Sequence, residues 1–144
     1  MLSALGGSKV AIIGHARPDG DCIGSQVALA RVLAARGHDA LCINPDPVPR
    51  RLQFLVEGVA FTRTDDVVRT MADRAAIFVD CADHARGGDR LKAHYPEPVA
   101  MIDHHISNVG YASANLIDST SAATCEILAG MFLDNLLPID ARTA

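Results

Sequence analysis

Three short apolar runs stand out along the chain, and polar residues follow each of them directly. They are residues 10–13 (VAII), 75–79 (AAIFV) and 98–102 (PVAMI). Runs of four or five apolar residues with these polar boundaries are typical of buried strands. The pattern therefore predicts three strands in the interior of one sheet.

Two longer segments repeat apolar residues at helical spacing. The first runs from Ile23 to Arg36, with Gly37 as a C-terminal stop. The second runs from about 122 to 137, with Ser119, Thr120 and Ser121 as its cap. Weaker signals predict a strand at 40–43, helical turns at 51–56, a helix from 64 to about 74, and loops at 83–90 and 107–115. This alternation predicts an α/β fold, a parallel sheet with helices on both faces.

The polar residues that follow the three apolar runs have side chains of the types that bind metal ions. They are His15, Asp19, Asp21, Asp80, Asp103 and His104. If the three strands are neighbours in a parallel sheet, these side chains converge on the carboxyl edge, where ligands bind. Carboxylates with one or two imidazoles favour Mn²⁺ or a similar ion over a structural zinc.

Composition narrows the class of protein. The chain has 144 residues, 49% of them hydrophobic, and a net charge of -4, which predicts one folded domain and no extended surface for long nucleic acid. The cysteines are widely spaced and predict buried reduced thiols in a cytoplasmic protein: Cys22, Cys42, Cys81 and Cys125. The sequence contains no secretory signal and no apolar run of the roughly 18 residues that span a membrane.

Three motifs resemble those of the DHH phosphoesterase superfamily. Residues 15–25 (HARPDGDCIGS) are similar to its first motif, HxxPDxDxxGS, and residues 79–80 (VD) to its second. Residues 103–105 (DHH) are the motif that names the family. Residues 118–126 (DSTSAATCE) resemble a segment of the nanoRNase and phosphoadenosine-phosphatase branch, although Ala122 and Ala123 depart from its pattern. The resemblance covers essentially the whole chain and implies a Rossmann-like, three-layer DHH domain.

The resemblance also implies a centre for two ions, Mn²⁺ with Mg²⁺ or Co²⁺ as alternatives. The first ion would be bound by His15, Asp19 and Asp80, and the second by Asp21, Asp80 and His104. Asp103 would orient an imidazole, and His105 would contact the scissile phosphate. Arg17 and Ser25 are candidates for substrate contact, with solvation of Arg17 and helix capping by Ser25 as equal alternatives.

Two parts of the family pattern are missing from this chain. We find neither its fourth motif, with a further metal-binding aspartate, nor its C-terminal substrate domain. We therefore expect residues 1–144 to be an N-terminal catalytic domain that stops before both. We expect it to be a poor enzyme alone, with an exposed apolar patch that favours self-association, a homodimer being one outcome.

The resemblance implies hydrolysis of short oligoribonucleotides, 3′-phosphoadenosine 5′-phosphate or linear dinucleotides. Pyrophosphatase or exopolyphosphatase activity on the same site is the alternative enzyme, and a catalytically silent metal-binding or regulatory domain is the alternative of another class. Two residues outside the motifs are given structural rather than functional roles. We expect His84 to be solvated in a loop and Phe54 to pack in the core.

Overall fold

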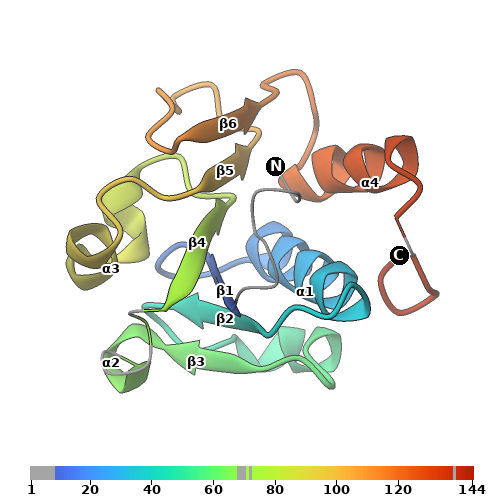
Figure 1. The fold of residues 1–144 in the computed structure, drawn as a ribbon, viewed down its shortest axis with the longest axis horizontal. Helices are drawn as coiled ribbons and strands as arrows, with labels where there is room; N and C mark the ends of the chain where they lie inside the picture. The colour runs from blue at the N-terminus through green and yellow to red at the C-terminus, as the bar shows by residue number, and fades with distance from the viewer. Residues whose placement is uncertain (1–8, 68–70, 72, 138) are drawn as a thin grey trace.

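One parallel sheet organises the chain (Figure 1). The computed structural model describes residues 9–67, 71, 73–137 and 139–144. The six strands are β1 (Lys9–Ile13), β2 (Ala40–Asn44), β3 (Phe61–Arg63), β4 (Arg74–Val79), β5 (Ala100–Asp103) and β6 (Ala114–Ile117), in the spatial order β3-β2-β1-β4-β5-β6. The three apolar runs are β1, β4 and β5, and they are adjacent, which confirms the predicted interior of the sheet.

Helices cover both faces of the sheet, as predicted. The helices α1 (Gly20–Ala35) and α4 (Thr124–Asp134) lie on one side, and α3 (Asp89–His94) lies on the other (Figure 1). The remaining helical segments are α2 (Thr64–Val67) and the 3₁₀ segments η2 (Arg50–Leu55) and η3 (His84–Gly87). Two apolar clusters result, one under α1 and α4 and one under α3.

Alternation along β1 shows how one strand supplies both clusters. Val10 and Ile12 pack in the cluster under α1 and α4, whereas Ala11 and Ile13 pack in the cluster under α3. All four side chains are fully buried. Successive side chains of a strand point to opposite faces, so a continuous apolar run is needed where both faces are covered.

Two strands and several boundaries differ from the sequence predictions. The edge strands β3 and β6 were not predicted: no element was assigned to β3, and β6 overlaps the end of the loop predicted at 107–115. Both strands are short and neither has a fully buried side chain, so they lack an apolar signal. Helix α1 begins at Gly20 rather than Ile23. A helix does begin at Thr64, as predicted, but it does not reach residue 74, since residue 71 is not helical and β4 begins at Arg74; residues 68–70 and 72 lie outside the described residues.

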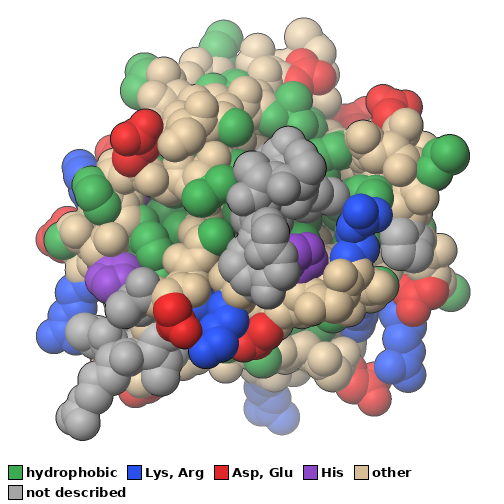
Figure 2. Space-filling model, in the orientation of Figure 1, with side chains coloured by type: hydrophobic (Ala, Val, Ile, Leu, Met, Phe, Trp, Pro, Cys, Tyr) green, Lys and Arg blue, Asp and Glu red, His purple; other side chains and the backbone are tan. Residues whose placement is uncertain are grey.

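The surface carries charges of both signs. On the face shown in Figure 2, Lys and Arg side chains alternate with Asp and Glu around the rim, and hydrophobic side chains are visible between them. Among the described residues, no helix is both long and apolar enough to cross a membrane.

Candidate metal centre

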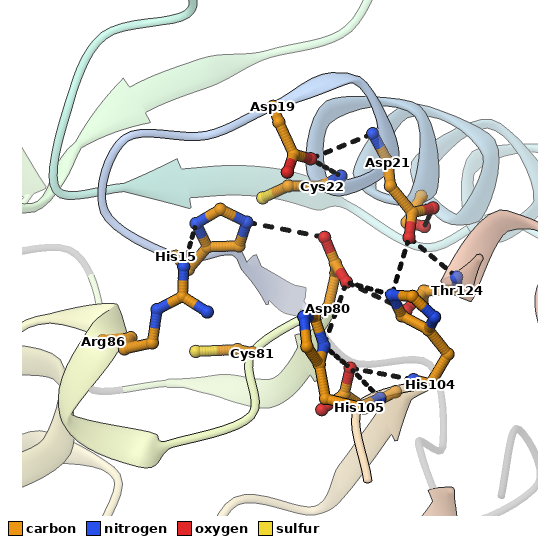
Figure 3. Close-up of polar contacts among 12 residues, drawn as sticks. His15, Asp19, Asp21, Cys22, Asp80, Cys81, Arg86, His104, His105 and Thr124 are labelled. Atoms are coloured by element: carbon orange, nitrogen blue, oxygen red, sulfur yellow. Dashed lines mark hydrogen bonds and ion pairs between the residues drawn. The ribbon is translucent and has the colours of Figure 1, made fainter. Parts of the chain in front are cut away.

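The polar residues meet at the carboxyl ends of β1, β4 and β5 (Figure 3). The strand order reverses between β1 and β4, since the chain proceeds from β1 to β2 and β3 in one direction and from β4 to β5 and β6 in the other. His15 follows β1, Asp80 follows β4, and Asp103 ends β5. Crevices at such a reversal are where open parallel sheets bind ligands.

Asp80 occupies the middle of the cluster. Its side chain is buried, 1% exposed, and its backbone has a φ of 52°, a left-handed value that few residues other than glycine adopt. One oxygen, Oδ2, lies 3.4 Å from Nε2 of His15. The other, Oδ1, lies 3.7 Å from Nε2 of His104 and accepts a hydrogen bond from Oγ1 of Thr124. The two oxygens thus face opposite sides of the centre.

Electrostatics at this position favour a cation. Burial raises the pKa of Asp80 above its ordinary value, and the negative charges of Asp21 and Asp19 raise it further. A carboxylate that is destabilised by burial and by like charges gains most from a bound positive charge. Structural ion pairs also shift pKa values, so the assignment of a metal site here rests on the distances between ligand atoms.

Two imidazoles are held in the orientation of metal ligands. Nδ1 of His15 lies 2.8 Å from the carbonyl oxygen of Ala16, and Nδ1 of His104 lies 3.4 Å from that of Ser121. A hydrogen on each Nδ1 therefore has a backbone acceptor, and each Nε2 faces a carboxylate oxygen of Asp80. Metal-binding histidines are commonly fixed by this contact from the other ring nitrogen. Burial opposes protonation of His15, but hydrogen bonds with Asp80 and Ala16 outweigh it and raise its pKa.

His105 differs from these two histidines. Its Nδ1 lies 2.7 Å from Oδ1 of Asp103, so this nitrogen donates its hydrogen to a fully buried carboxylate. Asp103 also accepts from the backbone N–H groups of His104 and His105 and from Nδ2 of Asn108. Both Asp103 oxygens are therefore engaged with the 104–108 loop. The side chain of His105 is 36% exposed, against 4% for His15.

The DHH histidines lie closer together than strand alternation predicts. Their ring centroids are 4.5 Å apart, and Nδ1 of His105 lies 3.6 Å from the same Asp80 oxygen that His104 approaches. Both side chains therefore face Asp80, although successive side chains of a strand point to opposite faces. The strand ends at Asp103, and the bonds from both following N–H groups to its carboxylate turn the chain.

The two aspartates of the first motif have structural partners as well. Oδ1 of Asp19 accepts from the N–H groups of Asp21 and Cys22 and caps α1, while its carboxylate lies on the side of His15 and Asp80 (Figure 3). Asp21 accepts from the N–H groups of Thr124 and Cys125. Burial acts to raise the pKa of Asp21, but these backbone donors lower it overall.

Two compact groups of ligand atoms share Asp80. One consists of His15, Cys22 and Asp80, and the other of Asp80, His104 and His105; within each, the ligand atoms lie within 4.8 Å of one another. Asp19 and Asp21 are in neither group, although Oδ2 of Asp21 lies 3.6 Å from Nε2 of His104. The described residues therefore offer two adjacent positions for a cation.

The proposed substrate residues lie in contrasting environments. Arg17 is exposed, and its backbone N–H donates to Asp46. Ser25 is fully buried, with its hydroxyl 3.4 Å from Asp21 and 3.3 Å from the sulfur of Cys125. Capping of α1 by Ser25 is wrong, because Asp19 is the cap. Ser119–Ser121 likewise do not cap α4: its N-cap is Ala123, with no side-chain bond.

Two simpler interpretations are also wrong. His84 is 7% exposed and stacks on Tyr111, with ring centroids 4.6 Å apart, so it belongs to the interior. Phe54 is 74% exposed rather than packed in the core. Short 3₁₀ segments lack the periodicity that shows which side chain faces inward.

Three residues that lie beside the centre were not assigned a role there from the sequence. They are Cys22, Arg86 and Thr124. Cys22 lies directly after Asp21 in the first motif, which is the only signal for it. Arg86 lies 3.1 Å from Nδ1 of His15, and Thr124 donates to Asp80, although both are remote in sequence from these partners. All four cysteines are free, as predicted, and Cys125 is the one that is partly exposed.

A large apolar cavity adjoins the centre without forming part of it. It has a volume of about 430 Å³ and lies between α1, α4 and residues 139–144, reaching the centre at Gly24 and Cys125. Leu133 and Leu136 lie exposed near the end of α4. These residues provide the expected apolar patch; self-association through it stays a prediction.

Comparisons with known proteins agree with the motifs. Residues 9–143 match the model of the DHH family, N-terminal domain. The chain is 32% identical over 129 residues to the bifunctional oligoribonuclease and PAP phosphatase NrnA of Thermus thermophilus, and 28% identical over 123 residues to the protein of that name in Mycoplasma pneumoniae. These alignments cover 89% and 82% of this chain.

A solved structure shows the same fold. An exopolyphosphatase-related protein from Bacteroides fragilis superposes with a TM-score of 0.79 at 21% identity, over 88% of this chain and 39% of its own. The chain spans about 37% of the length of the two curated relatives. The motifs, the fold and the family match over residues 9–143 agree, and the chain belongs to the DHH family as its N-terminal domain.

Proposed function

We propose that this chain is the catalytic domain of a metal-dependent phosphoesterase that hydrolyses short oligoribonucleotides, 3′-phosphoadenosine 5′-phosphate or linear dinucleotides. One observation carries the proposal: Asp80 is buried between two imidazoles, with Oδ2 toward His15 and Oδ1 toward His104. The names of the two curated relatives support this substrate class.

The donor set fits two divalent ions. We assign His15, Asp19 and Asp80 to the first and Asp21, Asp80 and His104 to the second, with Asp80 shared. The carboxylates and imidazoles favour Mn²⁺, with Mg²⁺ or Co²⁺ as alternatives. When bound, a pair of such ions lowers the pKa of an attacking water and offsets the charge of a phosphate.

The protein's own residues contribute orientation and charge. Asp103 holds the ring of His105 through Nδ1, so Nε2, when it carries a proton, can donate to a phosphate oxygen at the exposed side of the centre. A ligand role through Nδ1 would break that 2.7 Å hydrogen bond. We therefore assign His105 to the substrate and His104 to the second ion.

Calorimetric titration with Mn²⁺ tests the shared carboxylate. Asp80→Asn keeps the shape of the side chain and removes its charge, so we expect both binding steps to weaken. Asp89→Asn, an exposed aspartate that begins α3, is the matched control and should bind as the wild type does. Unchanged stoichiometry and affinity in Asp80→Asn would rule out the shared ligand.

A second experiment separates the roles of the two histidines. In a chain extended through the fourth motif and the substrate domain, we expect His105→Ala to keep its metal content and lose phosphoester turnover, and His104→Ala to lose metal. Equal loss of metal in both variants would reverse the assignment. The substrates are an RNA dinucleotide, 3′-phosphoadenosine 5′-phosphate, pyrophosphate and polyphosphate. Preference for either inorganic substrate would favour the pyrophosphatase alternative, and metal binding without turnover in the extended chain would favour a silent domain.

A further inference from the structure

A thiol lies among the ligand atoms of the first ion position. Cys22 is fully buried, and its sulfur lies within 4.8 Å of ligand atoms of both His15 and Asp80. In Figure 3 its side chain extends toward the ring of His15, beneath Asp19. The sulfur thus faces the same space as the imidazole and the carboxylate.

The backbone leaves room for this sulfur. A Cβ on Gly14 would lie 2.5 Å from Sγ of Cys22, so the absence of a side chain at position 14 lets the thiol sit against the end of β1. Cys22 is also in the first turn of α1, whose N–H groups and dipole favour negative charge. Burial raises the pKa of the Cys22 thiol well above its ordinary value, so the metal-free chain holds it as the protonated thiol.

We propose that Cys22 is a ligand of the ion bound by His15 and Asp80. This inference rests on the metal centre proposed above. On binding, the S–H bond breaks, a sulfur–metal bond forms and the proton passes to solvent, with no change in oxidation state. A thiolate beside an imidazole and a carboxylate favours Zn²⁺ or Co²⁺ over Mn²⁺ and Mg²⁺. The second position has oxygen and nitrogen ligands only and keeps its preference for a harder ion.

The alternative is that Cys22 only fills space. Buried cysteines often behave as small apolar residues. The nearest side-chain acceptor for the thiol is Oε1 of Gln26 at 4.0 Å, a long contact even for sulfur. A packing role and a ligand role predict different spectra, because only a sulfur bound to the metal changes the metal's electronic absorption.

The test is a Co²⁺ titration of the metal-free chain in the presence of a non-thiol reductant, followed by absorption. We expect visible bands from the bound cobalt and a near-ultraviolet charge-transfer band from a cobalt–thiolate bond. Cys22→Ser should lose the near-ultraviolet band and keep the visible bands, and its affinity for Zn²⁺ should fall because a thiolate ligand is lost. Cys42→Ala, Cys81→Ala and Cys125→Ala each remove one of the other three thiols and should keep the near-ultraviolet band.

The outcomes separate this inference from the metal centre itself. Visible bands without a charge-transfer band in the wild type would overturn the role of Cys22 and leave the metal centre standing. Absence of cobalt binding, or binding unaffected by Asp80→Asn, would overturn both. If Cys22→Ser fails to fold, a band that persists in each of the other cysteine variants still assigns the bond to Cys22, and loss of the band in one of them overturns the assignment.

Discussion

At the scale of single residues, the centre depends on how closely atoms approach at the end of β1. A Cβ at position 14 would lie 2.5 Å from both Oδ1 of Asn44 and Sγ of Cys22. Asn44 is itself fixed, because its Nδ2 donates to Gln26, which in turn donates to the carbonyl of Ile12. The neighbours of Gly14 are therefore held by buried hydrogen bonds and have little freedom to move.

We expect Gly14→Ala to lower the free energy of unfolding by about 1–3 kcal/mol, the usual cost of forcing an added methyl into a packed interior. Gly130→Ala is the matched control. It lies within α4 with open space around its Cβ position, so alanine should raise stability by about 0.5–1 kcal/mol. Urea denaturation measures both. A neutral Gly14→Ala would show that the end of β1 yields easily.

Because His84 is buried, we expect the free energy of unfolding to decrease as the pH falls. Burial lowers its pKa below 6.5, so the folded state binds the proton less readily than the unfolded state. As pH falls below 6.5, the unfolded state is protonated first and the free energy of unfolding decreases. We expect His84→Phe, which keeps an aromatic ring against Tyr111, to lose less stability than the wild type between about pH 7.5 and pH 5.5.

The difference in slope is at most that of one proton, about 1.4 kcal/mol per pH unit. Denaturation in a chelator keeps metal ligation out of the measurement. His94→Phe, which removes an exposed imidazole, is the control for the loss of a histidine. Parallel pH profiles for the wild type and His84→Phe would contradict the assignment.

At the scale of elements, α4 is capped by a residue of α1. The N-cap position of α4 is Ala123, which has no side-chain acceptor. Instead, Asp21 accepts from the N–H groups of Thr124 and Cys125, at 2.8 Å each. A carboxylate at a helix N-terminus satisfies free donors and interacts favourably with the dipole. Asp21 therefore ties two helices together at the edge of the centre.

We expect Asp21→Ala to cost about 0.5–2 kcal/mol of stability in metal-free protein, the usual cost of losing a cap. Asp134→Ala removes an exposed carboxylate from the C-terminal end of α4, where it caps nothing, and should be neutral or slightly stabilising. Both are measured by urea denaturation in the presence of a chelator. Equal effects of the two substitutions would show that Asp21 does not stabilise α4.

At the scale of the whole molecule, charge limits the class of substrate. The chain has 13 Lys and Arg against 17 Asp and Glu. Acidic and basic side chains are interspersed on the face shown in Figure 2. The net charge of -4 disfavours an extended track for a nucleic-acid backbone, so we expect affinity to come from the metal centre and the few groups around it.

We therefore expect short RNA to bind with a weak dependence on salt. If one or two phosphates are neutralised, the plot of log affinity against log salt has a slope of about -1 to -2. Competition between a dinucleotide and a long single strand, at several KCl concentrations, measures it. A slope that becomes steeper as the strand lengthens would show that the surface has a basic track despite the net negative charge of the chain.

Much of the fold was predictable from the sequence. The strands β1, β4 and β5 are covered on both faces, and only continuous apolar runs satisfy that requirement, so their positions were visible in the pattern. The edge strands β3 and β6 were not predicted because an edge strand does not need apolar side chains on both of its faces. The carboxylates and imidazoles of the centre were also predictable, since they belong to short motifs at the ends of strands.

What the sequence determined by itself is the chemical content of the centre: which carboxylates and imidazoles follow the buried strands, and that parallel strands bring them to one edge. The tertiary structure decided what each side chain does there. Asp103 bonds to His105, Asp21 caps α4, and Cys22 lies beside His15. These contacts join residues by way of turns and helix packing that no local periodicity encodes, so they exist only once the sheet and its helices are assembled.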